Sequence, residues 1–143
     1  MKLSRRPVTE ADIPFLLALR RETMDGHLAA SGIAIDDASR RVRVMHAFDC
    51  AELLLADGVP VGLLKLRKLP HEWEIVQVQL APALQGRGVG RSLLQKILAE
   101  AARAGVPVSL SVLKANPAKR LYEELGFEVF GEDAHEFHMR IGA

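Results

Sequence analysis

The sequence is poor in cysteine, in aromatic residues and in net charge, and each shortage excludes a class of protein. Its one cysteine, Cys50, cannot form an internal disulfide, and no Cys/His spacing indicates a metal site. With 19 basic and 18 acidic residues, the formal net charge of +1 gives no overall field that would attract nucleic acid or a membrane surface. No apolar stretch reaches the roughly 18 residues of a membrane-spanning helix. We therefore expect a soluble protein with no bound metal.

What the chain does have is enough length and apolar content for one hydrophobic core. Its 143 residues, 49% of them hydrophobic, predict a single domain over residues 1–143. The N-terminal residues 1–8 contain no apolar segment of the kind found in secretory signals. We therefore expect a cytoplasmic location.

The most informative segment is the run Gln-Gly-Arg-Gly-Val-Gly-Arg-Ser-Leu-Leu at residues 85–94. Its three glycines let the backbone bend sharply and expose successive N–H groups. Apolar residues then recur at helical spacing as far as Ala101. A glycine turn before a helix N-terminus is an anion site, because free amides and the positive end of the helix dipole point the same way. With Arg87 and Arg91 adding positive charge, the segment predicts a phosphate-bearing ligand.

Two common phosphate-binding motifs do not fit this segment. A P-loop ends in Gly-Lys-Ser or Gly-Lys-Thr, and the chain contains neither triplet. The dinucleotide fingerprint Gly-x-Gly-x-x-Gly could begin at Gly86, but its third glycine would then fall on Arg91. What remains is Gln85-x-x-Gly88-x-Gly90, preceded by a strand-like run at 75–80.

This arrangement resembles the acetyl-CoA signature of the GNAT superfamily of acyl-CoA N-acyltransferases, a Q/R-x-x-G-x-G/A turn that holds the pyrophosphate of CoA. A second segment, residues 116–127, resembles the GNAT segment that follows the fifth strand. It matches at Asn116, Tyr122, Gly126 and Phe127 and departs at its alanine, which stands at 118 where the family often has it one position later. Two separate segments that match the same family are stronger evidence than either match alone.

Local patterns predict the element order β-α-α-β-β-β-α-β-α-β-β, which is that of the GNAT fold. The resemblance implies an α/β (α+β) domain with a mixed, mostly antiparallel central sheet flanked by helices. We expect strands at 3–8, 51–56, 61–69, 73–80, 106–112, 127–130 and 135–141, and helices at 10–24, 37–47, 89–104 and 117–125. Residues 25–31 read as a loop or a short second helix. Thr9 and Asn116 are the expected helix caps, and Gly105 is the expected helix end.

The resemblance implies direct acetyl transfer from acetyl-CoA to an amine in a ternary complex. An alkyl amine with a pKa near roughly 10 is almost fully protonated at pH 7, so a base must remove its proton. The carbonyl oxygen needs a hydrogen-bond donor as it gains negative charge, and the departing thiolate needs a proton. Tyr122, the only tyrosine, matches the family's proton donor. It sits at the edge of the apolar helix face, where the alternative role is plain packing in the core.

The same resemblance assigns the remaining cofactor contacts. The backbone of the strand before the glycine turn would supply the carbonyl donor and pair with pantetheine, and its candidates are Val78, Gln79 and Leu80. The residues assigned to the pyrophosphate are Gln85, Gly86, Arg87, Gly88, Val89, Gly90, Arg91 and Ser92. Asn116 is assigned as a helix cap and as a pantetheine contact.

Several residues are candidates for the base that removes the proton from the amine. Glu74 matches one position where some family members carry a glutamate, while Val76 occupies another such position and cannot act. The alternative role of Glu74 is a solvated carboxylate at a strand end, and a water chain held by Gln77 or Gln79 is the alternative route for the proton. The weaker candidates are His27 and His71.

The acceptor is predicted only as a class, a small-molecule or peptide amine. Residues 25–49 and the last hairpin should shape its site. Asp36 and Asp37 would suit a polyamine or an aminoglycoside, whereas Arg40, Arg41 and Arg43 would suit a carboxylate-bearing amino acid. Two other functions stay open, a catalytically silent acyl-CoA-binding or sensor domain and a protein that binds NAD or ATP. The sequence also leaves open whether the chain is a monomer or a homodimer.

Overall fold

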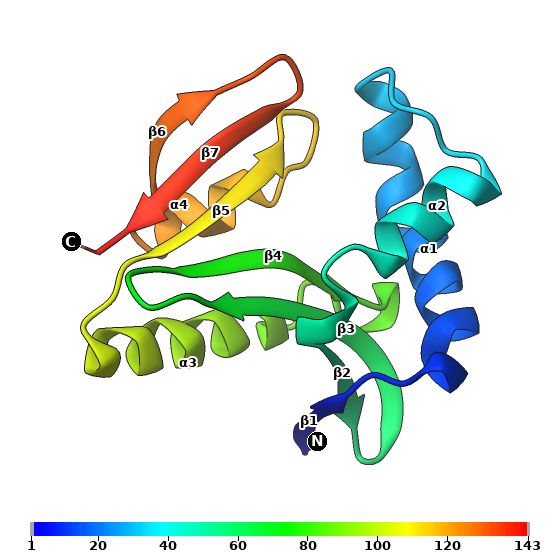
Figure 1. The fold of residues 1–143 in the computed structure, drawn as a ribbon, viewed down its shortest axis with the longest axis horizontal. Coiled ribbons are helices and arrows are strands. Elements are labelled where there is room, and N and C mark those ends of the chain that lie inside the picture. The colour runs from blue at the N-terminus through cyan, green and yellow to red at the C-terminus, as the bar shows by residue number, and fades with distance from the viewer. Residues whose placement is uncertain (1, 143) are drawn as a thin grey trace.

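The computed structural model describes residues 2–142 as a seven-stranded sheet with helices on both faces (Figure 1). The strands are β1 (Leu3–Pro7), β2 (Ala51–Ala56), β3 (Val59–Lys68), β4 (Trp73–Leu80), β5 (Val108–Leu113), β6 (Glu128–Glu132) and β7 (Glu136–Ile141). The α-helices are α1 (Ile13–Ala30), α2 (Asp37–Met45), α3 (Val89–Ala104) and α4 (Lys119–Glu124). The predicted fold class and element order are confirmed.

The sheet opens between β4 and β5. Its strand order is β1-β2-β3-β4-β5-β7-β6, and every neighbouring pair is antiparallel except β4 and β5. These two parallel strands pair only from Trp73 with Val108 to Ile75 with Leu110. Beyond that point β5, β7 and β6 turn away from the first four strands (Figure 1). The gap leaves backbone groups of both strands without a sheet partner on that side, as a strand-like ligand would require.

A bulge in β4 lies where the gap begins. Lys65 of β3 pairs with Gln77, and the next β3 residue, Leu66, pairs with Ile75, so Val76 has no partner on β3. An extra residue of this kind bends the strand and increases its twist. The bulge therefore turns β4 away from β5 and changes which side chains face each side of the sheet.

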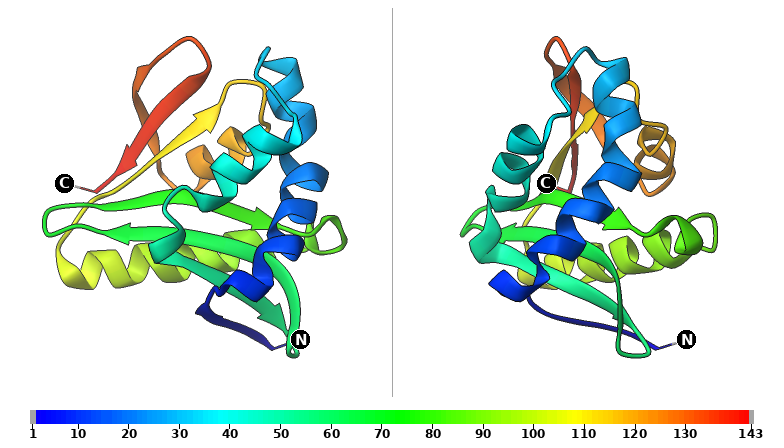
Figure 2. Two further views of the ribbon diagram at one scale, coloured as in Figure 1. Left: turned by 45° about the vertical axis from the view of Figure 1, so that its right-hand side comes forward. Right: turned by 90° about the vertical axis from the view of Figure 1, so that its right-hand side faces the viewer.

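Two apolar layers cover the two faces of the sheet (Figure 2). In β2 the adjacent residues Leu53 and Leu54 are both fully buried, but they belong to opposite layers. Leu54 packs in the layer of α3 and α4, and Leu53 in the layer of α1 and α2. The predicted apolar stripe of α3 is confirmed, since its buried residues include Leu93 and Ile97.

The first helix is longer than the sequence predicted. It continues from Met24, the expected end, to Ala30, so residues 25–30 are neither a loop nor a separate helix. Gly26 disfavours a helix, but Leu28 is 3% exposed, and its burial holds the second half of α1 against the protein. In the first half of α1, Leu16 and Leu19 are buried and Leu17 is half-buried. This second half of α1 forms one wall of the site described below.

Other helix ends follow their local signals with small shifts. Gly105 ends α3 in the left-handed conformation with φ 71°, as its position predicted. Asn116 Oδ1 accepts a hydrogen bond from the Ala118 N–H at 3.0 Å, so the expected cap is present, although α4 itself begins later, at Lys119. No helix among residues 2–142 is long and apolar enough to cross a membrane.

Candidate active site

Two cavities lie along the gap between β4 and β5. The first has a volume of about 410 Å³ and is bounded by α1, β4, β5 and the β6–β7 turn. The second, about 470 Å³, lies between the glycine turn, the first turn of α3 and α4. We call them the acceptor-side cavity and the cradle. Val78 and Tyr122 line both, so the two cavities meet at these side chains.

The cradle has the backbone that an anion site requires. Gly86 and Gly88 have φ values of +75° and +76°, a conformation that other residues adopt only with strain. A Cβ built on either glycine would meet no protein atom within 4 Å, so open space lies in front of the turn. The first helical hydrogen bond of α3 runs from the Ser92 N–H to the Gly88 carbonyl, and the amides before it have no partner within the helix. These features fit the pyrophosphate of CoA.

The residues of the glycine turn differ in whether they line the cradle. The Gln85 amide donates to the Leu80 carbonyl at 3.1 Å, which ties the turn to the end of β4. Arg91 lines the cradle and forms an ion pair with Glu124 of α4. The lining also includes Gly86, Gly88, Gly90 and Gln85, whereas Arg87, Val89 and Ser92 lie outside it. Arg87 is exposed, so its charge can act on a ligand only from the rim.

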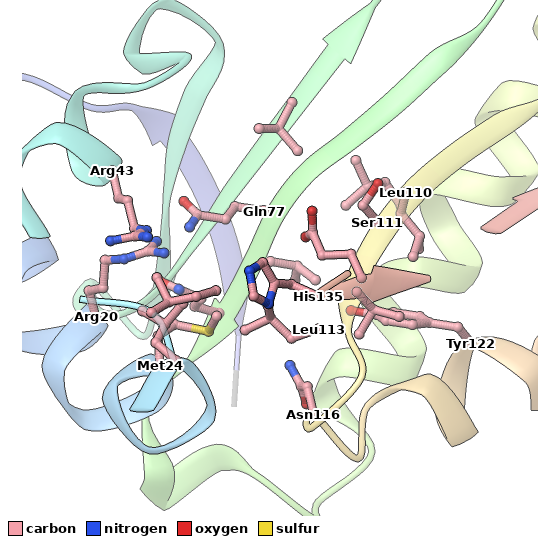
Figure 3. Close-up of a pocket in the computed structure, with 18 of the residues that line it drawn as sticks. Arg20, Met24, Arg43, Gln77, Leu110, Ser111, Leu113, Asn116, Tyr122 and His135 are labelled. Atoms are coloured by element: carbon pink, nitrogen blue, oxygen red, sulfur yellow. The ribbon is translucent and has the colours of Figure 1, made fainter. Parts of the chain in front are cut away.

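Tyr122 joins the cradle to the acceptor-side cavity. It is 8% exposed and packs edge-on against Phe127, with ring centroids 5.9 Å apart. Figure 3 shows its hydroxyl directed into the acceptor-side cavity. Burial raises the pKa of Tyr122 to about 12, so the phenol is fully protonated at neutral pH. The buried phenol is therefore a weaker acid than an exposed tyrosine.

The chain has a glycine cradle and a buried tyrosine at the opening of the sheet. A family model also matches most of its length. The model of the acetyltransferase (GNAT) family matches residues 17–127. The chain belongs to this family. Its members are acyl-transferring enzymes, so the fold and the family inferred from the two sequence signatures are confirmed.

Two curated relatives of the chain are acetyltransferases. The chain is 38% identical over 95 residues to the mycothiol acetyltransferase of Brachybacterium faecium, a match that covers 60% of this chain and 29% of that protein. It is 40% identical over 79 residues to the N-alpha-acetyltransferase RimI of Mycobacterium tuberculosis, covering 52% of this chain and 49% of that one. The chain thus spans half or less of the length of these relatives.

Solved structures show the same fold over the whole chain. The PaiA N-acetyltransferase of Thermoplasma acidophilum, determined in complex with coenzyme A, has a TM-score of 0.77 at 17% identity, with both chains covered completely. An acetyltransferase of Thermus thermophilus has a TM-score of 0.79 at 24% identity, covering 100% of this chain and 98% of its own. At these identities the likeness concerns the GNAT fold alone.

The structure does not bring the expected base to the GNAT site. The Glu74 carboxylate lies 3.2 Å from the Arg67 guanidinium, and 42% of its side chain is exposed. Glu74 lines neither the cradle nor the acceptor-side cavity, and the same holds for His27 and His71. Glu74 is placed where β4 and β5 still pair, before the gap opens. Gln77 and Gln79, the residues named for a water chain, do line the acceptor-side cavity.

A hydrogen-bonded chain that sequence reasoning missed borders the same cavity. Ser111 Oγ lies 2.8 Å from Nδ1 of His138, and Nε2 of His138 lies 3.2 Å from a carboxylate oxygen of Asp133. Ser111 and Asp133 both line the acceptor-side cavity. The other oxygen of Asp133 accepts from the N–H groups of His135 and Glu136, and these bonds lower the pKa of Asp133. The three side chains come from β5, β7 and the turn before β7, and only the strand register places Ser111 opposite His138.

Arg20 is the second residue that sequence reasoning missed. Its position directly after the apolar run 13–19 gave no sign of a site, yet it is 5% exposed and lines the acceptor-side cavity. Within residues 2–142, four buried side-chain nitrogen or oxygen atoms have no hydrogen-bond partner: Nε and Nη1 of Arg20, Oε1 of Gln77 and Nε2 of Gln79. All three residues line this one cavity, which is the pattern expected where a polar ligand or water binds.

Proposed function

We propose that this GNAT protein is an acetyl-CoA-dependent N-acetyltransferase that forms a ternary complex with a small-molecule or peptide amine. The observation that carries the proposal is the position of Tyr122. Its buried phenol lines both the cradle and the acceptor-side cavity, so one proton donor faces the place where two ligands would meet. A domain that only held CoA would need the cradle but not a second polar cavity beyond it.

The residues of the cradle fit CoA. The free amides of the first turn of α3 would bind the pyrophosphate, and the open edges of β4 at Val78, Gln79 and Leu80 would pair with pantetheine. Acetyl-CoA, when bound there, supplies an activated acetyl group on a thioester. A backbone N–H just after the Val76 bulge would hydrogen-bond the thioester carbonyl oxygen. Tyr122 would donate its proton to the departing sulfur. Asn116 lines the acceptor-side cavity, but its side-chain oxygen is occupied as a helix cap.

For the base, the chain Ser111–His138–Asp133 fits better than Glu74. If Nε2 of His138 carries its proton toward Asp133, Nδ1 is free to accept one from Ser111. The acceptor amine would then pass a proton to Ser111 as the Ser111 hydroxyl passes its own to His138. Asp133 would stabilise the charged imidazole that results. The alternative route is water held by the unpartnered amides of Gln77 and Gln79.

Calorimetry and a turnover assay test the proposal together. The protein should bind CoA and should not bind NAD or ATP with comparable affinity. It should also release free CoA thiol from acetyl-CoA when a suitable amine is added. Tight CoA binding with no turnover over a broad panel of amines would identify a sensor instead. Binding of NAD or ATP with no affinity for CoA would identify a nucleotide-binding protein.

A further inference from the structure

The Arg20 guanidinium is a buried cation that forms neither a hydrogen bond nor an ion pair with the described residues 2–142. The residue is 5% exposed, and its Nε and Nη1 atoms are covered and have no partner within residues 2–142. Burial lowers the pKa of Arg20 to about 10, which still leaves it charged at neutral pH. An unpaired buried charge is strongly unfavourable in a folded protein unless a ligand completes its hydrogen bonds.

The neighbours of Arg20 increase the positive charge instead of cancelling it. Arg43 of α2 lies beside it, and Figure 3 shows the two guanidinium groups next to each other at one end of the acceptor-side cavity. The nearby carboxylate of Asp25 is already engaged, since Arg40 donates to it through Nε at 3.1 Å and Nη2 at 2.6 Å. Asp25 therefore acts on Arg20 only through its charge, because its hydrogen bonds go to Arg40.

Lys65 fixes the part of the backbone that carries Arg43. It is completely buried, and its ammonium donates to the carbonyl oxygens of Arg43, Val44 and His46 at 3.1, 2.9 and 2.5 Å. These bonds fix the C-terminal end of α2, which carries Arg43, and add a third positive charge close to Arg20. The fold thus maintains two guanidinium groups side by side at the wall of a cavity.

The proposed proton donor, Tyr122, lies at the other end of the cavity from Arg20. Tyr122 and Arg20 lie at opposite ends of the view in Figure 3, with apolar side chains such as Met24 and Leu113 between them. The volume of about 410 Å³ suits a small molecule or a chain terminus. A ligand that filled it would present one end to Arg20 and the other to Tyr122.

We propose that Arg20 and Arg43 bind an anionic oxygen group, a carboxylate or a phosphate, carried by the amine acceptor. The inference rests on the proposed function and names the acceptor class. Planar guanidinium groups match the paired oxygens of carboxylates and phosphates and can donate two bonds at once. A second ammonium group is disfavoured at this end of the cavity, because it would face Arg20 and Arg43.

A homologous series of acceptors tests this directly. Thiol release from acetyl-CoA is measured with ω-amino carboxylates and aminoalkyl phosphates of increasing chain length, each against the alkylamine of matched length. The best anionic acceptor should exceed its matched alkylamine in kcat/KM by about tenfold or more, the size of a charge-assisted hydrogen bond. The chain length at the optimum reports the span from Arg20 to the reacting centre, and the two anion classes show which group is preferred.

Variants test whether Arg20 causes the preference for anionic acceptors. In Arg20→Gln the ratio between anionic and neutral acceptors should fall to near one. The matched control is Arg41→Gln, an exposed arginine of α2 outside the acceptor-side cavity, which should keep the full ratio. If Arg20→Gln does not fold, Arg43→Gln makes the same test from the half-buried partner. A preference for neutral or polycationic amines, or one that survives Arg20→Gln, overturns the inference while leaving the acetyltransferase proposal in place.

A binding measurement separates the two proposals. N-acetylated ω-amino carboxylates and the matching phosphates should raise the melting temperature of the parent protein and not that of Arg20→Gln. If that difference is found but no amine is acetylated, the anion subsite stands and the proposed function fails. If amines are acetylated and neither anion class shifts the parent, the subsite is wrong.

Discussion

Replacing Gly88 by alanine should remove CoA binding, whereas the same replacement at Gly90 should not. Gly88 has φ +76°, so an alanine there costs about 1–2 kcal/mol of backbone strain. The added Cβ would also enter the open space in front of the turn, where no protein atom lies within 4 Å. Gly90 is helical, and its added Cβ would make an ordinary contact with Leu80 Cδ1 at 3.5 Å. The GNAT pattern itself allows glycine or alanine at this position.

Thermal melting with and without CoA distinguishes strain from lost binding. Strain alone should lower the melting temperature of free Gly88→Ala by about 3–8 °C. At a CoA concentration of about 100 times Kd, binding stabilises the parent by about 2.7 kcal/mol, a rise of about 10 °C. We expect that rise to vanish in Gly88→Ala and to persist in Gly90→Ala, whose free protein should melt at or above the parent temperature.

Either of two results would refute this account of the cradle. A full CoA-dependent rise in Gly88→Ala would show that the space in front of the turn is not where the pyrophosphate binds. Loss of the rise in Gly90→Ala, with the free protein unchanged, would show that CoA packs directly against Gly90, where this account leaves room for a methyl group.

Four further substitutions test the chemistry and one local ion pair. Tyr122→Phe should lower kcat at least about tenfold with CoA affinity nearly unchanged, since only the hydroxyl is removed, as steady-state kinetics and calorimetry would show. His138→Gln should lower kcat more than Glu74→Gln, because His138 is linked to the acceptor-side cavity through Ser111 and Glu74 is ion-paired outside it. Asp12→Asn should cost on the order of 1 kcal/mol at pH 7 in denaturant unfolding, because Arg6 makes two hydrogen bonds to Asp12, one to each carboxylate oxygen.

The pH dependence of the last change has a definite sign. The Arg6 guanidinium lowers the pKa of Asp12 from 3.8 to about 2 in the folded protein. Its stabilisation is therefore complete above the unfolded value and is lost as the pH falls through about 4 to about 2. The difference between the parent and Asp12→Asn should shrink over that interval. A difference that stays constant down to pH 2 would contradict the ion-pair explanation.

The kinetic variants have equally specific contrary results. Unchanged turnover in Tyr122→Phe would remove the proton-donor role. If His138→Gln retains full kcat, the proton leaves through water at Gln77 and Gln79. If Glu74→Gln alone loses activity, the glutamate inferred from the strand position is the base after all, and the protein must rearrange around the Arg67 pair to use it.

The sequence by itself determined the parts of this protein that depend on local backbone chemistry. Glycines at 86, 88 and 105 specify left-handed turns, and the apolar periodicity of 93–101 specifies the helix that packs beneath the sheet. The cradle and its family resemblance followed from those signals, because a phosphate site of this kind is built from one short segment. Tyr122 was also found, since it lies in a second continuous motif.

Tertiary structure alone decided what faces the acceptor. Leu28 extends α1 past Gly26 by being buried, and that extension forms a wall of the acceptor-side cavity. Ser111 and His138 meet only because β5 and β7 pair in one register, although α4 and β6 separate the two strands in the sequence. In the sequence Arg20 is indistinguishable from an exposed helix residue, and only packing against other elements buries it. The glycine turn of the cradle is built from consecutive residues, whereas the acceptor-side cavity is lined by residues of several elements that packing brings together, so the sequence predicted the first and not the second.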